Sequence, residues 1–215
     1  MKDLAELTLD GFLDRVAERT PTPGGGSVAA LAGALSCAMA RMVTAYSVGK
    51  KTDEARRVRV DSMACRLKLA DDLLRALVTR DGLAYSEMTA ARESLEKGAM
   101  DRAGFDQAVL NAIAVPMELA TAAAAALKAM DELKDDASRY LLSDLGVAAV
   151  LADAAGEAAA YTIRVNAGEL ADARLRSRIL TDLEQTLQHG TAHRNSVETY
   201  VRGSLEFEDR PAGGR

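Results

Sequence analysis

Tryptophan is absent from this chain of 215 residues, and aromatic residues make up only 4% of it. A core built on large rings is therefore excluded. Alanine, by contrast, occurs 42 times, so the core has to form from helices that approach closely with small side chains between them. No strand-like alternation of useful length is present. The sequence predicts an all-α fold, a multihelical bundle of long antiparallel helices.

Cysteine and histidine are also scarce, with two residues of each. Cys37 and Cys65 lie within predicted helices without the spacing of a disulfide framework, so we expect two small core residues in a reducing cytoplasm. His189 and His193 have a spacing that metal sites use, but Gly190 lies between them and no third ligand is near. The sequence therefore predicts neither a disulfide framework nor a metal site.

An excess of positive charge is missing as well, since the net charge is −5 and the pI about 5.2. Long-range attraction for nucleic acid or for an anionic membrane is therefore not expected. Lys2, Asp3 and Glu6 interrupt the first turns, so no targeting signal is visible. The uncharged stretch 20–40 is rich in alanine, glycine and serine, which argues against a membrane span. We expect a cytoplasmic protein with neither partner.

Nothing in the chain is typical of a linker between domains. We predict a single helical domain over residues 1–205, followed by a disordered tail over 206–215. Many of the alanine faces are too weak to be stable alone, so burial against a second subunit is expected. The sequence thus favours a homodimer.

The most informative motif is a loop of prolines and glycines before a serine. It reads Pro21-Thr22-Pro23-Gly24-Gly25-Gly26-Ser27. The prolines hold the approach rigid, the glycines allow something to come close, and Ser27 is the predicted N-cap of a helix over 27–47. Such a helix N-terminus presents free N–H groups to a carboxylate or phosphate. The alternative is a tight elbow that only lets two helices pack.

The predicted helix over 27–47 has two different faces. Its larger side chains form one apolar stripe of Val28, Leu31, Leu35, Met39 and Met42, and its smaller ones a flat face of Ala29, Gly33, Cys37 and Ala40. One face is expected to pack, and the other to let a neighbour come close.

Asp81 occupies an otherwise apolar seam in the predicted helix over 53–95. The seam consists of Val60, Met63, Leu67, Ala70, Leu74, Leu77, Asp81, Ala84 and Met88. A carboxylate in such a seam has to be paired, neutralised or turned toward a wet cavity, because burying it alone is prohibitive. The alternative is that residues 80–82 form a turn that ends the helix.

Further polar residues follow predicted helix ends. Lys50 and Lys51 come directly after the helix over 27–47 and begin a basic cluster, which predicts either anion binding or a solvated face. Ser143 and Asp144 are interpreted as a helix cap, with a ligand-facing carboxylate as the alternative. Asn166 is either a left-handed helix terminator or a polar contact for a ligand.

Proline and glycine also predict helix boundaries. One helix is expected over 101–115, and Pro116 is expected to begin the next. The helix that starts near 143 can break at Gly156 and at Gly168. If residues 144–166 formed one unbroken helix instead, its ends would be roughly 33 Å apart. A ligand could then meet both ends only if a partner chain brought them together.

Six motifs, taken in order, resemble the cyclodeaminase/cyclohydrolase family, which comprises methenyltetrahydrofolate cyclohydrolases and the cyclodeaminase domain of formiminotransferase-cyclodeaminase. The motifs are Pro21-x-Pro23-Gly24-Gly25-Gly26-Ser27, Gly49-Lys50-Lys51, Asp81-x-x-Ala84-Tyr85, Val115-Pro116, Ser143-Asp144-x-Gly146-Val147-Ala148 and Val165-Asn166. The similarity extends over residues 7–201. Departures from the family pattern fall on polar and loop positions: Thr52-Asp53, residues 137–140, Thr162 and a missing Leu-Pro-Lys element.

The resemblance implies an all-helical homodimer that binds a folate substrate near the subunit interface, with no metal and no redox cofactor. The expected reaction is hydrolysis of 5,10-methenyltetrahydrofolate to 10-formyltetrahydrofolate. The alternatives are ammonia release from 5-formiminotetrahydrofolate and a non-catalytic dimer that binds a folate or another anion. The one-carbon unit of the methenyl compound is cationic, so a carboxylate beside it would stabilise the charge and accept a proton from water.

The site residues follow from this resemblance and this chemistry. Asp81 is the expected carboxylate, and Lys50 or Lys51 would hold a folate carboxylate or assist proton transfer to the departing nitrogen. Asp144 or Asn166 would read the hydrogen-bonding edge of the pterin. The other expected substrate-binding residues are Pro23, Gly24, Gly25, Gly26, Ser27, Tyr85 and Ser143.

Overall fold

The computed structural model describes residues 4–205, which form helices and no strand, so the predicted all-α class is confirmed. The α-helices are α1 (Leu9–Ala17), α2 (Gly25–Ser47), α3 (Glu54–Glu96), α4 (Arg102–Leu133), α5 (Leu142–Gly168) and α6 (Ala173–Leu205). Short 3₁₀ helices span Leu4–Glu6, Lys134–Asp136 and Arg139–Leu141. The predicted tail over 206–215 lies outside the described residues.

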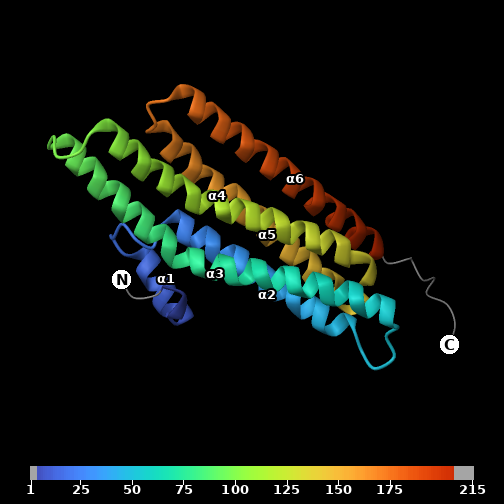
Figure 1. Cartoon of the computed structure of the whole chain (residues 1–215). Helices are drawn as coiled ribbons and strands as arrows, with labels where there is room; N and C mark the ends of the chain where they lie inside the picture. The colour runs from blue at the N-terminus through green and yellow to red at the C-terminus, as the bar shows by residue number, and fades with distance from the viewer. Residues whose placement is uncertain (1–3, 206–215) are drawn as a thin grey trace.

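Four helices form the bundle, in which α2 packs against α3 and α5, and α4 packs against the same two helices. α6 lies in the groove between α4 and α5. The long helices alternate in direction, so the α3–α4 and α5–α6 connections lie at one end of the bundle (Figure 1). The α2–α3 and α4–α5 connections lie at the other end. The small α1 packs its buried Phe12 at the side of the bundle.

Small residues let the helices of the bundle approach closely, as the composition predicts. The flat face of α2, with Ala29, Gly33 and Cys37, is buried. A Cβ added at Gly33 would lie 3.0 Å from Leu74 Cδ2 of α3 and 3.5 Å from Ala155 Cβ of α5. Three helices therefore meet at this glycine. Cys37 is buried as expected, whereas the expectation for Cys65 is wrong, because its side chain is exposed on α3.

Several predicted boundaries shift in the structure. α2 begins two residues early, with Gly24 as its N-cap, because the Ser27 hydroxyl is turned toward Asp81 and does not cap the helix. α3 is continuous through residues 80–82, which excludes the turn there. Thr8 and Asp53 act as N-caps and accept backbone N–H groups at Gly11 and Arg56 respectively.

Two predicted helix breaks are absent. Pro116 does not start a helix but lies in the middle of α4, with its ring buried. Gly156 is buried inside an unbroken α5, where a Cβ would lie 3.5 Å from Leu187 Cδ2 of α6. Ser143 and Asp144 follow the start of α5 rather than capping it, since Leu141 stands at the N-cap. Close packing overrides the local tendency of both glycine and proline to interrupt a helix.

By length and composition alone, two helical segments could cross a membrane: Gly25–Ser47 and Arg102–Asp136. Half of each apolar window is buried inside the bundle. Core helices of a bundle meet the same test, because they too are long and apolar.

Candidate active site

A cavity of about 350 Å³ lies at the end of the bundle where α2 begins. It is enclosed by the loop before α2, the first turn of α2, the middle of α3 and α4, and the last turns of α5. Its lining residues are Pro21, Thr22, Gly24, Gly25, Gly26, Asp81, Tyr85, Ala112, Tyr161, Thr162, Val165 and Asn166. Four segments that are far apart in the sequence thus meet at one hollow.

The glycines of the loop make room for a carboxylate. The Thr22–Pro23 peptide bond is cis, and Gly24 caps α2 without a side-chain hydrogen bond. A Cβ added at Gly26 would lie 2.0 Å from Oδ1 of Asp81, so no other residue fits there while the carboxylate keeps its position. Gly26 is therefore needed for the approach of Asp81, which a mere elbow between helices would not explain.

Asp81 lies at the positive end of the α2 dipole. Its Oδ2 accepts a hydrogen bond from the Ser27 hydroxyl at 3.3 Å, and the Ser27 backbone N–H also donates to the carboxylate. No Lys, Arg or His of residues 4–205 forms an ion pair with it. Burial raises the pKa of Asp81 above its ordinary value of 3.8, and the two hydrogen bonds from Ser27 oppose this rise without cancelling it.

A second acidic side chain, Asp71, is more deeply buried but is fully paired. Its side chain is 1% exposed and lies between two guanidinium groups, with Arg41 Nη1 at 2.5 Å and Arg75 Nε at 2.6 Å. This network links α2 to α3. Asp71 therefore stabilises the bundle, whereas Asp81 keeps its charge free for a ligand.

Asn166 forms part of the opposite wall of the cavity. It lies within α5, two residues before the end of the helix, so the interpretation as a left-handed terminator is wrong. Its Nδ2 donates to the backbone oxygen of Ala112 on α4 at 3.1 Å. The rings of Tyr85 and Tyr161 are roughly half exposed or more beside it. The cavity thus combines one carboxylate, one amide and two aromatic rings.

Six of the residues expected at the site line this cavity: Gly24, Gly25, Gly26, Asp81, Tyr85 and Asn166. Pro23 and Ser27 are buried behind its wall, and Ser27 acts through its contacts to Asp81. Sequence reasoning missed Tyr161 and Val165 as lining residues. Their signal was the helical spacing, because Tyr161 and Val165 are four residues apart, as are Thr162 and Asn166, and the two pairs lie next to each other on α5.

Four other expected site residues lie at the far end of the bundle: Lys50, Lys51, Ser143 and Asp144. α2 has 23 residues between the cavity and Lys50, a length of about 35 Å. α5 is equally unbroken, so Asp144 and Asn166 are roughly 33 Å apart. Within one chain, these four residues do not share a pocket with Asp81.

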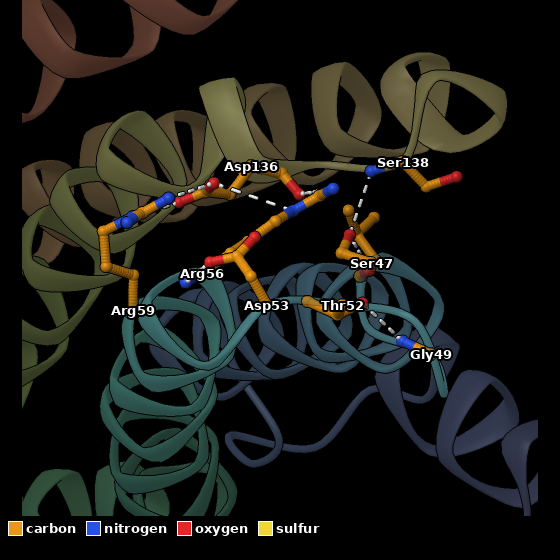
Figure 2. A network of polar contacts seen from close by, with 9 residues as sticks. Ser47, Gly49, Thr52, Asp53, Arg56, Arg59, Asp136 and Ser138 are labelled. Carbon is orange, nitrogen blue, oxygen red and sulfur yellow. Dashed lines mark hydrogen bonds and ion pairs between the residues drawn. The ribbon is translucent and has the colours of Figure 1, made fainter.

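The loop that carries Lys50 and Lys51 is held by hydrogen bonds from the Gly49 N–H to the Thr52 hydroxyl and from Arg57 to the Gly49 oxygen, and a polar network lies beside it. Figure 2 shows Arg56 and Arg59 directed at Asp136, and Arg59 Nε lies 2.7 Å from Asp136 Oδ2. The side-chain hydrogen bond from Arg59, with the positive charges of Arg59 and Arg56, lowers the pKa of Asp136 below its ordinary value. Among the described residues, both lysines are exposed and form no ion pair. Of the basic cluster predicted here, the two lysines keep their charge available.

The described residues include no group of three or more His, Cys, Asp and Glu side chains that could hold a metal ion. His193 Nδ1 lies 2.8 Å from Asp131 Oδ2, so this histidine links α6 to α4. The expectation that no metal takes part stays a prediction.

The fold and the cavity define a class of protein: an all-α bundle with a carboxylate-bearing cavity at a helix N-terminus. A sequence model described as formiminotransferase-cyclodeaminase matches residues 8–185. The chain belongs to this family.

Individual relatives agree with that assignment. The chain is 28% identical to a methenyltetrahydrofolate cyclohydrolase of Methylorubrum extorquens over 92% of its length and 97% of the relative's. It is 28% identical to the mouse formimidoyltransferase-cyclodeaminase, over 95% of this chain but only 38% of the mouse protein. The crystal structure of formiminotetrahydrofolate cyclodeaminase from Thermotoga maritima superposes with a TM-score of 0.85 at 27% identity, covering 92% of this chain and 97% of that one. Both folate activities are therefore represented among its relatives.

Proposed function

We propose that this protein hydrolyses the cyclic amidinium group of 5,10-methenyltetrahydrofolate to give 10-formyltetrahydrofolate. The observation that carries the proposal is Asp81, a carboxylate that forms no ion pair within residues 4–205 and has a raised pKa at the wall of a cavity. The methenyl compound brings a positive charge to its reacting carbon, and a carboxylate in a partly desolvated cavity stabilises such a charge. Similarity to the cyclohydrolase of Methylorubrum extorquens supports the same reaction.

The chemistry needs one base. Water adds to the amidinium carbon, which forms a C–O bond, while its proton passes to the Asp81 carboxylate. The bond between that carbon and the pterin-side nitrogen then breaks as the new hydroxyl loses its proton and the nitrogen gains one. One proton is released overall, from Asp81 to solvent. A raised pKa makes the Asp81 carboxylate a stronger base for this proton.

The other residues that line the cavity suit the flat pterin ring system of a folate. The amide oxygen of Asn166 would accept from an N–H group of the pterin, and the rings of Tyr85 and Tyr161 would pack against its faces. The cavity volume of about 350 Å³ is enough for the bicyclic head. The rest of the folate would extend over the neighbouring surface of α2 and α5.

That neighbouring surface is an uncharged face, called here the α2/α5 face. Its residues are Val28, Ala32, Leu35, Met39, Met42 and Tyr46 on α2 and Val147, Leu151, Ala154, Ala158, Thr162 and Val165 on α5, all exposed or half-buried. The larger stripe of α2 thus faces outward, while the small-residue face packs inside. Thr162 and Val165 also line the cavity, so the cavity and the α2/α5 face are continuous.

We propose that a second copy of the chain covers the α2/α5 face. Two helices about 35 Å long, with axes about 10 Å apart, present on the order of 700 Å², close to the roughly 800 Å² per partner of a standard interface. A two-fold axis across the helices would bring the partner's Lys50 and Lys51 to the cavity. Their free positive charges would then meet Asp81, which has no cationic partner of its own among the residues the structure describes.

The activity is tested by following the absorbance of 5,10-methenyltetrahydrofolate with wild type and with Asp81→Asn. We expect rapid loss of absorbance with wild type and a rate about 10²- to 10⁴-fold lower with the variant. Equal rates would remove Asp81 from the mechanism. Binding without turnover would favour a carrier, and ammonia release from 5-formiminotetrahydrofolate in a parallel assay would favour the cyclodeaminase.

The second copy is tested by matched glutamate substitutions and molar mass in solution. Leu35→Glu, where the side chain is 53% exposed on the α2/α5 face, and Ala154→Glu on α5 should convert a dimer into monomers with unchanged circular dichroism. Leu69→Glu, 66% exposed on α3 away from that face, should remain a dimer. A monomeric wild type would contradict the proposal. So would a wild type that binds phosphatidylcholine vesicles by the α2/α5 face and sediments with them.

Mixed dimers test whether the lysines act across the interface. Asp81→Asn and the double variant Lys50→Ala/Lys51→Ala should each be impaired alone. After unfolding and refolding as an equimolar mixture, one site in four would combine a native Asp81 with native lysines, so about a quarter of the wild-type activity should return. If the refolded mixture forms dimers but recovers no activity, the lysines of one chain do not act at the site of its partner.

A further inference from the structure

Pro116 leaves a gap in the hydrogen bonding of α4. A residue at this position of a helix normally donates its N–H to the carbonyl four residues earlier, which is that of Ala112. Proline has no N–H, and Ala112 and Pro116 are both buried. A buried carbonyl without a donor costs free energy, so the Ala112 oxygen needs a donor from elsewhere.

Asn166 of α5 supplies that donor. Its Nδ2 lies 3.1 Å from the Ala112 oxygen, and the asparagine is itself buried. The side-chain amide thus replaces the N–H that Pro116 lacks. One hydrogen bond links α4 to α5 at the wall of the cavity, since Ala112 and Asn166 both line it.

This hydrogen bond also decides which way the amide faces. A carbonyl oxygen only accepts, so the NH₂ group of Asn166 has to face Ala112 and the amide oxygen has to face away. Oδ1 forms no hydrogen bond within residues 4–205 and is not sealed from solvent. The cavity therefore offers Asn166 Oδ1 and the carboxylate of Asp81 as acceptors, while an N–H of the Asn166 amide is committed to Ala112.

We propose that Pro116 is a positioning residue that sets the polarity of ligand recognition. By withholding its N–H, Pro116 commits the NH₂ group of Asn166 to Ala112 and leaves an oxygen for the ligand. The cavity then selects a flat heterocycle that presents an N–H or NH₂ donor to Asn166. That the ligand is a folate rests on the proposed function. The new inference is how the cavity recognises the hydrogen-bonding edge of the pterin.

The hydrogen-bond exchange is tested without any ligand, by a double-mutant cycle in urea unfolding. Asn166→Ala alone leaves the Ala112 oxygen without a donor and should raise the unfolding equilibrium constant about tenfold. In a Pro116→Ala background, where the substituted residue supplies the missing backbone N–H, the same Asn166→Ala change should have little effect. Equal effects of Asn166→Ala in both backgrounds would overturn the exchange.

Recognition is tested by the dissociation constant for 5-formyltetrahydrofolate, a folate that lacks the cyclic amidinium group. Pro116→Ala and Asn166→Ala should each weaken binding about tenfold, and the double variant should be no weaker than either, because both changes act through one amide. The kcat for the methenyl compound should change much less than KM, since the carboxylate of Asp81 is untouched.

Asn111→Ala is the matched control, because among the described side chains this exposed amide of α4 has a hydrogen bond only with Gln107. It should change neither stability nor binding. Unchanged folate affinity in Pro116→Ala, beside weakened affinity in Asn166→Ala, would overturn the positioning role. A wild type that binds no folate would instead refute the proposed function, and the unfolding cycle would still decide whether Pro116 and Asn166 are coupled.

Discussion

Asp71 and Asp81 are ten residues apart on one helix, and their surroundings give them different roles. Asp71 is buried between the guanidinium groups of Arg41 and Arg75, which satisfy its charge. Asp81 is less buried, receives hydrogen bonds from Ser27 alone among residues 4–205 and faces the cavity. A carboxylate without a cation, held where its pKa is raised, is available for a cationic ligand or for a proton.

The raised pKa of Asp81 predicts a pH dependence with a definite sign. The base has to be ionised, so kcat/KM should fall as the pH is lowered through a pKa above the ordinary 3.8. For stability, a raised pKa means that the folded state holds the proton more tightly than the unfolded state does. Ionised Asp81 therefore opposes folding at neutral pH.

Asp81→Asn should accordingly have a higher melting temperature than wild type at pH 7, and the difference should shrink as the pH falls below the pKa of folded Asp81. Thermal unfolding at several pH values measures both. A variant that melts below wild type at pH 7 would show that Asp81 stabilises the fold, and its interpretation as a strained functional group would fail.

Gly26 is tested by adding one methyl group. The Cβ of Gly26→Ala would meet the Asp81 carboxylate at 2.0 Å, so the carboxylate has to move off the first turn of α2. We expect activity to fall about 10- to 100-fold and stability by about 1 kcal/mol. For the neighbouring Gly25→Ala, no atom lies within 4 Å of the new Cβ, so its melting temperature should not fall. Full activity in Gly26→Ala would contradict this account.

At the scale of the elements, the helices are longer than their proline and glycine residues predict. α4 continues through Pro116 because Asn166 satisfies the carbonyl that the proline leaves open. α5 continues through Gly156 because that glycine is packed against α4 and α6. The tendency of proline and glycine to interrupt a helix is a local property of the sequence. The free energy that keeps these helices continuous comes from packing against other helices.

Gly33, where α2 meets α3 and α5, tests that packing. Gly33→Val would force side-chain atoms into Leu74, which already lies 3.0 Å from an added Cβ. We expect a loss of about 1–3 kcal/mol in the free energy of unfolding, measured in urea. Gly203→Val on α6, where nothing lies within 4 Å of the new Cβ, is the control and should change it by less than about 0.5 kcal/mol. A small effect at Gly33 would mean that the helices are free to separate.

At the scale of the whole molecule, the site residues of one chain fall at two ends of the bundle. Asp81 and Asn166 lie at one end, and Lys50 and Asp144 at the other. The uncharged α2/α5 face runs between them. A second copy on this face would bury the apolar stripe and bring the two groups together.

Such a dimer predicts a melting temperature that depends on protein concentration. Raising the concentration 100-fold should raise it by about 3–5 °C, because association stabilises only the folded chains. In Leu35→Glu this dependence should disappear. Calorimetry at two concentrations measures it, and a wild type with one melting temperature at both would argue for a folded monomer.

Much of this protein follows from the spacing of its residues. The periodic apolar positions predict long helices, the glycine motif predicts a helix N-terminus open to an anion, and Asp81 stands out because desolvation makes a lone carboxylate in an apolar seam costly. The prediction of long helices and of Asp81 beside a cavity succeeds because helical periodicity and the cost of burying a charge are set by the chain itself, whereas the binding of an anion at the helix N-terminus stays a prediction.

The partners of each residue, however, are decided only by tertiary packing. The sequence could not reveal that Cys65 is exposed or that Asn166 replaces the N–H of Pro116. Each depends on which helices lie side by side and on how far an unbroken helix runs. Contacts between distant segments are made by the whole fold, and no short stretch of sequence contains them.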